Sequence, residues 1–235
     1  MIYILSTDTP HHRYFINRIL DSGIDIGKVY FETTSVKPKF QTGPFYKKET
    51  EDYEEANFFK DVSRDISRFK IVESENINDK LIYDDLVKEG SPDLGIVFGT
   101  RLIKKHIIDC FATGLINVHR GIAQEYRGLD SDLWAIYHKD FKNIGCTIHF
   151  VDSRLDTGNV VDQNTIVLTG DMKIYQIRYY TTVLATDMVI SSIKKYLAGE
   201  LTSNKQTKEG RYYSFMPIDL KIDAALKFNN YVSKL

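Results

Sequence analysis

The sequence is short of several features that mark common protein classes. Its 235 residues include two cysteines, Cys110 and Cys146, with no CxxC or Cys/His ligand spacing, so we expect neither a disulfide framework nor a metal site. The apolar run from Ile2 to Leu5 is too short for a signal peptide, and no run approaches the ~20 apolar residues of a membrane span. We therefore expect a cytoplasmic protein with no membrane partner.

Neither sign of charge is in excess. Lysine and arginine together number 31 and aspartate and glutamate number 32, which gives a formal net charge of -1. A protein that binds a long polyphosphate chain normally carries a basic surplus. We therefore expect no nucleic-acid partner.

The signature motifs of several α/β enzymes are also missing. The segment that follows the first apolar run, Ser6 to Pro10, contains no GxGxxG, and the chain has no GxxxxGK[ST], HExxH or GxSxG. These absences disfavour a Rossmann dehydrogenase, a P-loop enzyme, a zinc protease and an α/β-hydrolase.

What the first hundred residues contain is an alternation of strand-like and helix-like segments. Short apolar runs predict strands, and apolar residues at helical spacing predict helices between them. This rhythm favours an α/β fold with a Rossmann-like, mostly parallel sheet flanked by helices. The charge-rich stretch from Thr33 to Glu55 predicts a long surface loop or mobile segment. The predicted strands are Ile2–Leu5, Val29–Phe31, Ile71–Val72 and Leu94–Phe98, and the predicted helices are Tyr14–Leu20 and Asp79–Glu89.

The second half of the chain continues the alternation and ends in a distinct tail. Apolar residues spaced by three or four predict a long helix from Tyr175 to Leu197, which Gly199 is placed to stop. We expect a catalytic domain over residues 1–200 and a C-terminal extension over residues 201–235 with a helix from Asp219. The other predicted elements are strands at Leu115–His119, Cys146–Val151 and Val160–Leu168 and a helix that starts at Leu133.

Polar residues follow the predicted strands at the ends where open α/β sheets bind ligands. Alternation places Asn117 and His119 on the same side of an extended backbone, ~7 Å apart. An amide that donates, an imidazole that carries protons and a carboxylate at Asp156 that orients it form an acyl-transfer set. Each residue also has a structural interpretation alone: Asn117 and Asp156 as turn residues, and His119 as a hydrogen-bonded structural histidine.

Four motifs stand in one order within this region. They are Asn117-Val118-His119, Tyr126-Arg127-Gly128, the segment Gly145 to His149 and Asp156-Thr157-Gly158. In this order and at this spacing the chain resembles the formyltransferases that use N10-formyltetrahydrofolate. The resemblance covers the centre of the chain, and the first ninety residues share only the alternation of strands and helices.

The resemblance implies roles for these side chains. Asn117 would donate to the oxyanion that forms on the formyl group, and one such donor contributes on the order of 2.7–4 kcal/mol. His119 would stabilise the same oxyanion and move protons between the two nitrogens, and Asp156 would hold the histidine or a water. His149 would be a buried supporting histidine near the aspartate and would not itself react.

The resemblance also implies two binding regions, with no metal in either. Two departures from the family pattern fall in the loop beside the expected acceptor pocket. The loop between the first two motifs lacks the family's Ser-Leu-Leu-Pro, and Asp130-Ser131 replaces a proline that is usual after the second motif. The residues expected to bind the folate donor, largely through backbone groups, are Phe98, Gly99, Thr100, Arg101, Leu102, Val151, Asp152 and Asp156. Those expected to bind the acceptor are Arg120, Tyr126, Arg127, Gly128 and Trp134.

Among the family branches, sugar-nucleotide N-formyltransferases are the most similar. Members of this branch often carry an aromatic hairpin in the tail, which the segment from Gly210 to Phe215 matches. The expected acceptor is the amine of dTDP-4-amino-4,6-dideoxyglucose, with the 3-amino isomer next, for cell-surface polysaccharide such as lipopolysaccharide O-antigen. A homodimer is expected as well.

Other acceptors and classes remain open from the sequence. Glycinamide ribonucleotide formyltransferases carry a Gly-rich phosphate loop that Ser6 to Pro10 lacks. Methionyl-tRNA formyltransferases carry a further C-terminal domain and a basic surface, neither of which we expect here. A folate-dependent deformylase and a non-catalytic binding descendant of the fold are further alternatives.

Overall fold

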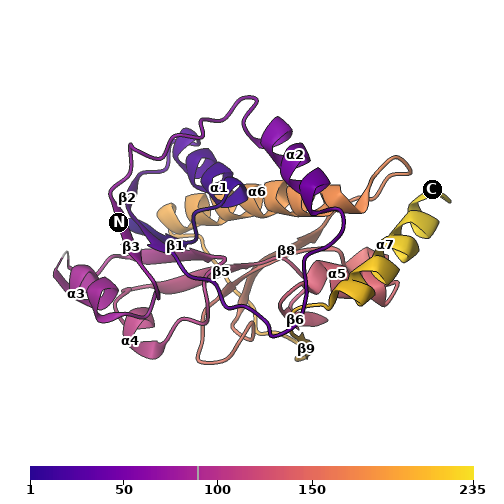
Figure 1. The fold of residues 1–235 in the computed structure, drawn as a ribbon. Coiled ribbons are helices and arrows are strands. Elements are labelled where there is room, and N and C mark those ends of the chain that lie inside the picture. The colour runs from indigo at the N-terminus through magenta and orange to yellow at the C-terminus, as the bar shows by residue number, and fades with distance from the viewer. Residues whose placement is uncertain (89) are drawn as a thin grey trace.

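A seven-stranded sheet forms the centre of the protein in the computed structural model, which describes residues 1–88 and 90–235 (Figure 1). The strand order is β3-β2-β1-β4-β5-β7-β8. The strands from β3 to β5 run parallel, and β7 is antiparallel to both of its neighbours. The predicted mostly parallel sheet is thus confirmed. The strands are β1 (Ile2–Ser6), β2 (Ile26–Glu32), β3 (Ile71–Ser74), β4 (Leu94–Phe98), β5 (Gly114–His119), β7 (Gly145–Phe150) and β8 (Val160–Thr165).

Helices cover both faces of this sheet. In the view of Figure 1, α1 (Pro10–Asp21), α2 (Lys47–Phe58) and α6 (Ile177–Leu197) lie above it, and α3 (Lys80–Lys88) and α4 (Lys105–Ile108) lie below. Alternate residues of β1 divide between the two cores: Ile4 packs in the core with α1 and α6, whereas Tyr3 and Leu5 pack in the core with α3 and α4. A sheet buried on both faces explains why its strands are runs of apolar residues.

A smaller layer lies past the start of β7 and the end of β8, where Ile144 and Ile166 pack in its core. It contains β6 (Tyr126–Gly128), α5 (Ser131–Tyr137) and, from the tail, β9 (Arg211–Tyr213) and α7 (Ile218–Val232). The expected final helix is therefore present, and it packs on α5. The expected hairpin is wrong, because β9 pairs in parallel with β6. Parallel partners are far apart in the chain, so no local turn signal could indicate this pairing. Two short 3-10 helices, Phe141–Asn143 and Ile174–Gln176, complete the elements.

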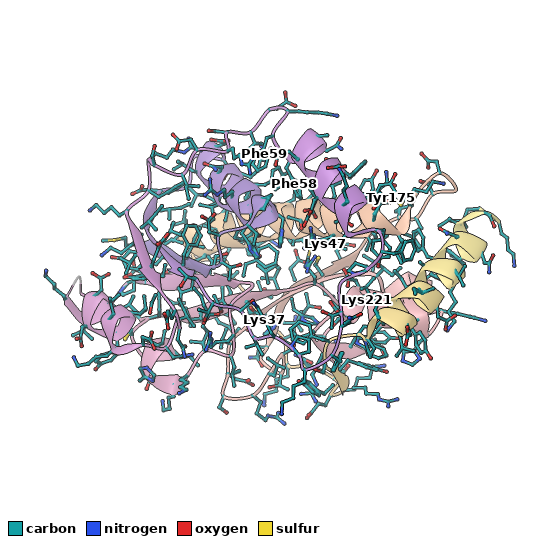
Figure 2. The ribbon with its side chains drawn as sticks, viewed as in Figure 1. Lys37, Lys47, Phe58, Phe59, Tyr175 and Lys221 are labelled. Carbon is teal, nitrogen blue, oxygen red and sulfur yellow. The ribbon has the colours of Figure 1, made fainter. Side chains whose placement is uncertain are left out.

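The expectation of a loop over Thr33 to Glu55 is wrong from Lys47 onward, where α2 begins. Thr50, Glu54 and Phe58 are buried on the inner face of that helix. The Glu54 carboxylate accepts two hydrogen bonds from Arg178 of α6, at 2.5 and 2.7 Å, and the Phe58 ring (labelled in Figure 2) stacks on Tyr14. A charge-rich composition suggested a solvated segment, but one of these charges is satisfied by a distant partner.

The remaining differences are small. The long helix is confirmed, and Gly199 follows its end with a φ of 73° that favours glycine. The strand expected to reach Leu168 ends at Thr165. Glu89, the last residue of the helix expected near Asp79, lies outside the described residues. None of the helices described is long and apolar enough to cross a membrane.

Candidate active site

A cavity of about 320 Å³ opens at the carboxyl ends of β4 and β5, the edge at which open α/β sheets bind ligands. Its volume is in the range of small-molecule sites. The polar ends of the strands, two loops, the start of α1 and the tail all contribute to its wall. The lining residues that matter below are His11, His12, Phe98–Leu102, Asn117, His119, Arg120, Gly128, Asp130, Asp132, His149, Val151, Arg154–Asp156 and Phe215.

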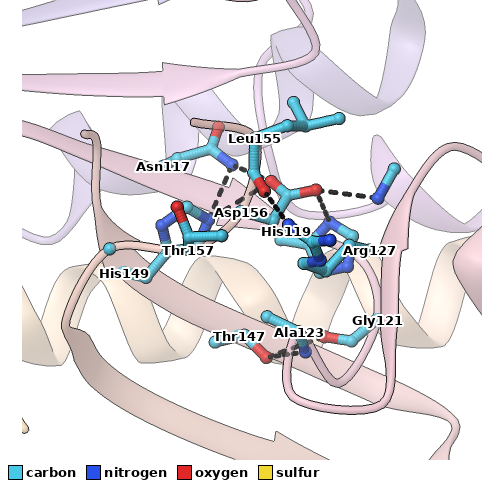
Figure 3. Close-up of polar contacts among 12 residues, drawn as sticks. Asn117, His119, Gly121, Ala123, Arg127, Thr147, His149, Leu155, Asp156 and Thr157 are labelled. Carbon is cyan, nitrogen blue, oxygen red and sulfur yellow. Dashed lines mark hydrogen bonds and ion pairs between the residues drawn. The ribbon is translucent and has the colours of Figure 1, made fainter. Parts of the chain in front are cut away.

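The Asp156 carboxylate lies at the centre of the polar cluster (Figure 3). One oxygen, Oδ2, accepts the Gly128 amide N–H at 2.8 Å and lies 3.5 Å from Nδ1 of His119. The other oxygen, Oδ1, lies 3.4 Å from Nε2 of His149 and 3.5 Å from the Asn117 amide nitrogen. The structure therefore brings together the three side chains that the sequence singled out for chemistry and the supporting His149.

Asp156 stays ionised although it is 95% buried, with a relative exposure of 5%. Burial alone would raise the pKa of this carboxyl, but the charge of His119, the hydrogen bond and charge of His149 and the Gly128 amide hold it well below its usual range. The cluster thus contains a negative charge that remains in place throughout the physiological pH range.

The Asn117 amide faces inward. Its nitrogen donates to Nε2 of His149 at 3.1 Å, and Figure 3 shows the amide oxygen on the opposite side. His149 is fixed in turn, because its Nδ1 donates to the Phe150 carbonyl at 2.8 Å. With its proton on Nδ1, the neutral ring can accept the Asn117 amide at Nε2, whereas a hydrogen bond from Nε2 to Asp156 requires the charged ring.

His119 has acceptors on both sides of its ring. Nε2 donates to the Tyr126 carbonyl at 2.7 Å, while Nδ1 faces the Asp156 carboxylate. Gly121 makes this position possible, since a Cβ there would lie 2.6 Å from Nε2. His119 reaches a substrate atom only after its ring turns away from one of the two acceptors.

Backbone conformation sets the distance between the two loops. Asp156 has a φ of 54° and Gly128 a φ of 95°, both in the left-handed region. A Cβ on Gly128 would lie 2.0 Å from the Tyr213 carbonyl oxygen of β9. Glycine is therefore required where the Gly128 amide approaches the carboxylate and the tail strand passes behind it.

Most of the residues expected to bind the donor line the cavity. Phe98 to Leu102, Val151 and Asp156 are in its wall. Asp152 is not: its carboxylate accepts hydrogen bonds from the Thr157 hydroxyl and the Arg154 amide, so it shapes the loop from within. The Arg101 guanidinium pairs with buried Glu32 of β2 and therefore braces the turn after β4.

The residues expected to bind the acceptor divide in two. Arg120 and Gly128 line the cavity, whereas Tyr126, Arg127 and Trp134 do not. The Tyr126 hydroxyl donates to Asp140, and the Trp134 indole donates to the Ser214 carbonyl and stacks on Tyr213. Arg127 donates to the Gly210 and Leu155 carbonyls, so it joins the tail to the Asp156 loop.

Sequence reasoning missed His11, His12 and Phe215, which also line the cavity. The two histidines are buried at the start of α1, and the Thr7 and Thr9 hydroxyls lie 2.8 Å from Nδ1 of His12. Burial, with the charges of Arg120 and Arg178, lowers the pKa of His12 to about 3, so its ring is neutral near pH 7. A histidine pair directly after Pro10 was the signal available in the sequence.

The profile of the formyl transferase family matches residues 45–182. The chain belongs to this family. Among curated proteins it is 29% identical to the methionyl-tRNA formyltransferase of Borreliella afzelii over 150 residues, which are 62% of this chain and 47% of that protein. It is 30% identical to that of Clostridium beijerinckii over 128 residues, 54% of this chain and 41% of that protein. The chain thus spans about half the length of the curated relatives it matches.

Solved structures share the fold at lower identity. A 4-N formyltransferase from Francisella tularensis superposes with a TM-score of 0.63 at 18% identity, covering 96% of this chain and 86% of that one. The formyltransferase PseJ from Anoxybacillus kamchatkensis was crystallised with a UDP-formamido sugar and tetrahydrofolate. It superposes with a TM-score of 0.57 at 17% sequence identity, covering 96% of this chain and 100% of that one. These likenesses establish the α/β formyltransferase fold.

Proposed function

We propose that this chain transfers the formyl group of N10-formyltetrahydrofolate to the amine of a sugar nucleotide. The observation that carries the proposal is the ionised Asp156, buried between His119, His149 and the Asn117 amide in the wall of the cavity. Buried charges of this kind are costly, and they concentrate at sites where chemistry needs them.

The reaction exchanges one carbon–nitrogen bond for another. The acceptor amine attacks the formyl carbon, the bond from that carbon to N10 breaks, the amine loses a proton and N10 gains one. Asp156 stabilises the positive charge that develops on the attacking nitrogen or on a histidine. A donor is needed for the oxyanion, and Asn117 supplies it once its amide turns away from His149. His119, after its ring turns, carries the proton.

The donor's binding region is the backbone of Phe98 to Leu102 together with Val151 and Leu155. Gly99, with a φ of 84°, lies directly against the His12 ring, because a Cβ there would be 2.4 Å from Nε2. The turn therefore rests on a neutral histidine, and internal hydrogen bonds hold its shape: the Phe98 carbonyl accepts from Ser6, and the Arg101 N–H donates to Glu32.

Charge in the acceptor region favours a small anionic substrate. Within the described part of the chain the Arg120 guanidinium, which lines the cavity, has no hydrogen bond or ion pair, so it is available to a phosphate group. His11 also borders a groove lined by Glu51, Asp52, Glu54 and Glu55. Each of these carboxylates pairs with a lysine or an arginine, so this groove does not discriminate between a small anion and a tRNA, and the proposal rests on Arg120.

Within this class we propose dTDP-4-amino-4,6-dideoxyglucose as the acceptor and the 3-amino isomer as the second choice. The formamido sugar in the PseJ structure supports the class through a shared fold. The sequence relatives favour methionyl-tRNA as the competing acceptor. We further propose that the chain acts in the cytoplasm as a homodimer and supplies a cell-surface polysaccharide such as O-antigen; light scattering tests the dimer.

An acceptor screen with formyl-labelled donor tests the proposal. Equal reactions contain each amino-sugar nucleotide, glycinamide ribonucleotide, methionyl-tRNA or no acceptor, and the label is followed by mass. We expect labelled amide on a sugar nucleotide, and none when its amine is already acetylated. Label on methionyl-tRNA alone would show that the acceptor is methionyl-tRNA and not a sugar nucleotide. Release of free formate without an acceptor would indicate a deformylase. Arg120→Met should raise the sugar-nucleotide KM more than Arg120→Lys does.

A further inference from the structure

The C-terminal tail contacts the loop that carries Asp156. Gln206, between α6 and β9, directs its amide nitrogen at two backbone carbonyls of this loop, donating to that of Asp156 at 2.8 Å and that of Gly158 at 3.0 Å. Both N–H groups of one side chain are thereby used on the residue that carries the buried carboxylate and on the residue two positions later. The other end of the amide, Oε1, is buried and finds no partner among the described residues.

This arrangement indicates that the two N–H donors are what the site uses. A glutamine whose oxygen is buried without a hydrogen bond carries a desolvation cost. The orientation of the amide therefore satisfies the two loop carbonyls and leaves its own oxygen without a partner in residues 1–88 and 90–235. A side chain that only covered surface could be apolar at lower cost.

The loop has a reason to need such a restraint. Asp156 is in the left-handed region at φ 54°, a conformation that is sparsely populated by residues other than glycine. A backbone held there persists only when its surroundings over-determine it. The carbonyl of Asp156 is one of the two atoms that Gln206 binds, so the restraint acts on the residue itself.

Further tail contacts act on the same loop. Glu209 pairs with both Arg154 and Arg127, and Arg127 in turn donates to the Leu155 carbonyl and to the Gly210 carbonyl. These ion pairs are partly exposed and contribute little individually. Gln206 is different, because it binds the backbone on both sides of Thr157 directly.

We propose that Gln206 is a positioning residue: it fixes the backbone of Asp156 and Gly158 so that the carboxylate meets His119, His149 and the Gly128 amide. The inference rests on the proposed formyl transfer for its kinetic consequence. Loss of the restraint shifts the carboxylate and lowers kcat, while the cavity that binds the two substrates is retained.

The test compares three substitutions in the full-length protein. Gln206→Leu removes both donors and keeps the approximate volume; we expect kcat to fall about tenfold or more with both KM values within threefold of wild type. Gln206→Glu places a carboxylate against two carbonyls, and it regains one O–H donor only when protonated. Its kcat relative to wild type should therefore rise as the pH falls from 8 to 5, whereas that of Gln206→Leu should stay level. Lys205→Ala, at an exposed neighbouring position, is the matched control and should equal wild type.

A measurement without substrate separates this inference from the proposed function. The ring ¹⁵N shifts of His119 and His149, assigned by substitution, should move in Gln206→Leu and not in Lys205→Ala. If those shifts move and no acceptor is formylated by wild type, the positioning role stands and the proposed function fails. If wild type is active while Gln206→Leu keeps both its kcat and its histidine shifts, the positioning role is wrong. Should Gln206→Leu fail to fold, Gln206→Glu takes its place in the test. A kcat for Gln206→Glu that stays at a constant fraction of the wild-type value from pH 8 to 5 would then overturn the proposal.

Discussion

Strands β4 and β5 are parallel neighbours in the middle of one sheet, yet they do different work. Every residue of β4 except Gly95 is an apolar side chain, and all five are buried. In β5 the same kind of apolar start is followed by Asn117 and His119 at the carboxyl end, and Val97 of β4 pairs in register with Asn117. Strand β4 therefore contributes only to the hydrophobic core. Strand β5 contributes to the core along its first part and to the candidate site at its carboxyl end.

The difference shows how polar groups are tolerated so close to the core. Asn117 and His119 do not stand alone, because the loop at Asp156 and the adjacent strand β7 bring a carboxylate and His149 to meet them. A buried polar group without partners costs free energy, whereas this cluster satisfies most of its donors and acceptors internally. The comparison predicts that damage to β4 changes stability and that damage to the end of β5 changes catalysis.

The largest expected effect is on stability, from Ile96→Ala in β4. Ile96 is fully buried, so truncation should lower the free energy of unfolding by about 2–5 kcal/mol, while Ile96→Val should cost about 0.5–1.5 kcal/mol. Denaturant titration measures both. The folded fraction of each variant should keep wild-type kcat, and a large loss of kcat at normal stability would break the division between the strands.

Substitutions at the polar cluster should have the next largest effect, on turnover. Asn117→Ala, His119→Ala and Asp156→Asn should each lower kcat by about a hundredfold, which corresponds to about 2.7 kcal/mol. Tetrahydrofolate affinity should change far less, and titration calorimetry measures it. Near-normal turnover in Asp156→Asn with folate still bound would remove the carboxylate from the chemistry.

A pH-dependent effect should distinguish the histidines of α1 from the polar cluster. The folded pKa of His12 is lowered to about 3 from an unfolded value near 6.5, mainly by burial. The unfolded chain therefore binds more protons between these values, so the stability that His12 contributes is present above pH 6.5 and is lost as the pH falls toward 3. The slope should reach about 1.4 kcal/mol per pH unit.

The control for this effect is His12→Gln, which cannot titrate. Its free energy of unfolding is measured between pH 7 and 4. As the pH falls, this free energy should fall less steeply than that of wild type, by about 1.4 kcal/mol per pH unit, because one fewer proton is taken up on unfolding. An identical slope in both proteins would show that the folded His12 takes up a proton as readily as the unfolded one.

The smallest expected effect comes from outside both strands, at Phe215 in the tail. Its ring lines the cavity, so Phe215→Ala should raise the acceptor KM by about three- to tenfold, consistent with about 1 kcal/mol of lost apolar contact. Tetrahydrofolate affinity should stay at the wild-type value. The exposed Tyr212→Ala is the comparison, and equal kinetics in both variants would limit the tail to packing.

The accuracy of sequence-based prediction follows the same division. Apolar strands such as Leu94–Phe98 are recognisable from their own sequence. Their alternation with helices predicts the mostly parallel sheet. The order of Asn117, His119, His149 and Asp156 was enough to expect them together. In contrast, α2 packs through a pair, Glu54 with Arg178, whose members are 124 residues apart in the chain. Strand β9 pairs with β6, to which no local turn connects it, so neither element leaves a local pattern in the sequence.

The assignment of Arg127 and Trp134 to the acceptor shows a second limit. Their motif places them near the site, and the structure uses them to hold the tail. Proximity in a motif does not tell which way a side chain points. His11 and His12 illustrate the reverse, because they belong to none of the four motifs and yet reach the cavity from the start of α1.

A single-turnover reaction tests directly whether the buried Asp156 cluster performs formyl transfer from folate to an amino sugar. Excess wild-type protein is mixed with N10-[¹³C]formyltetrahydrofolate and dTDP-4-amino-4,6-dideoxyglucose, with Asp156→Asn in parallel, and the ¹³C signal is followed. We expect the label to move to an amide carbon on the sugar in wild type, and to do so about a hundredfold more slowly in the variant. Label that stays on the folate in wild type, or that moves equally fast in both proteins, would contradict this expectation.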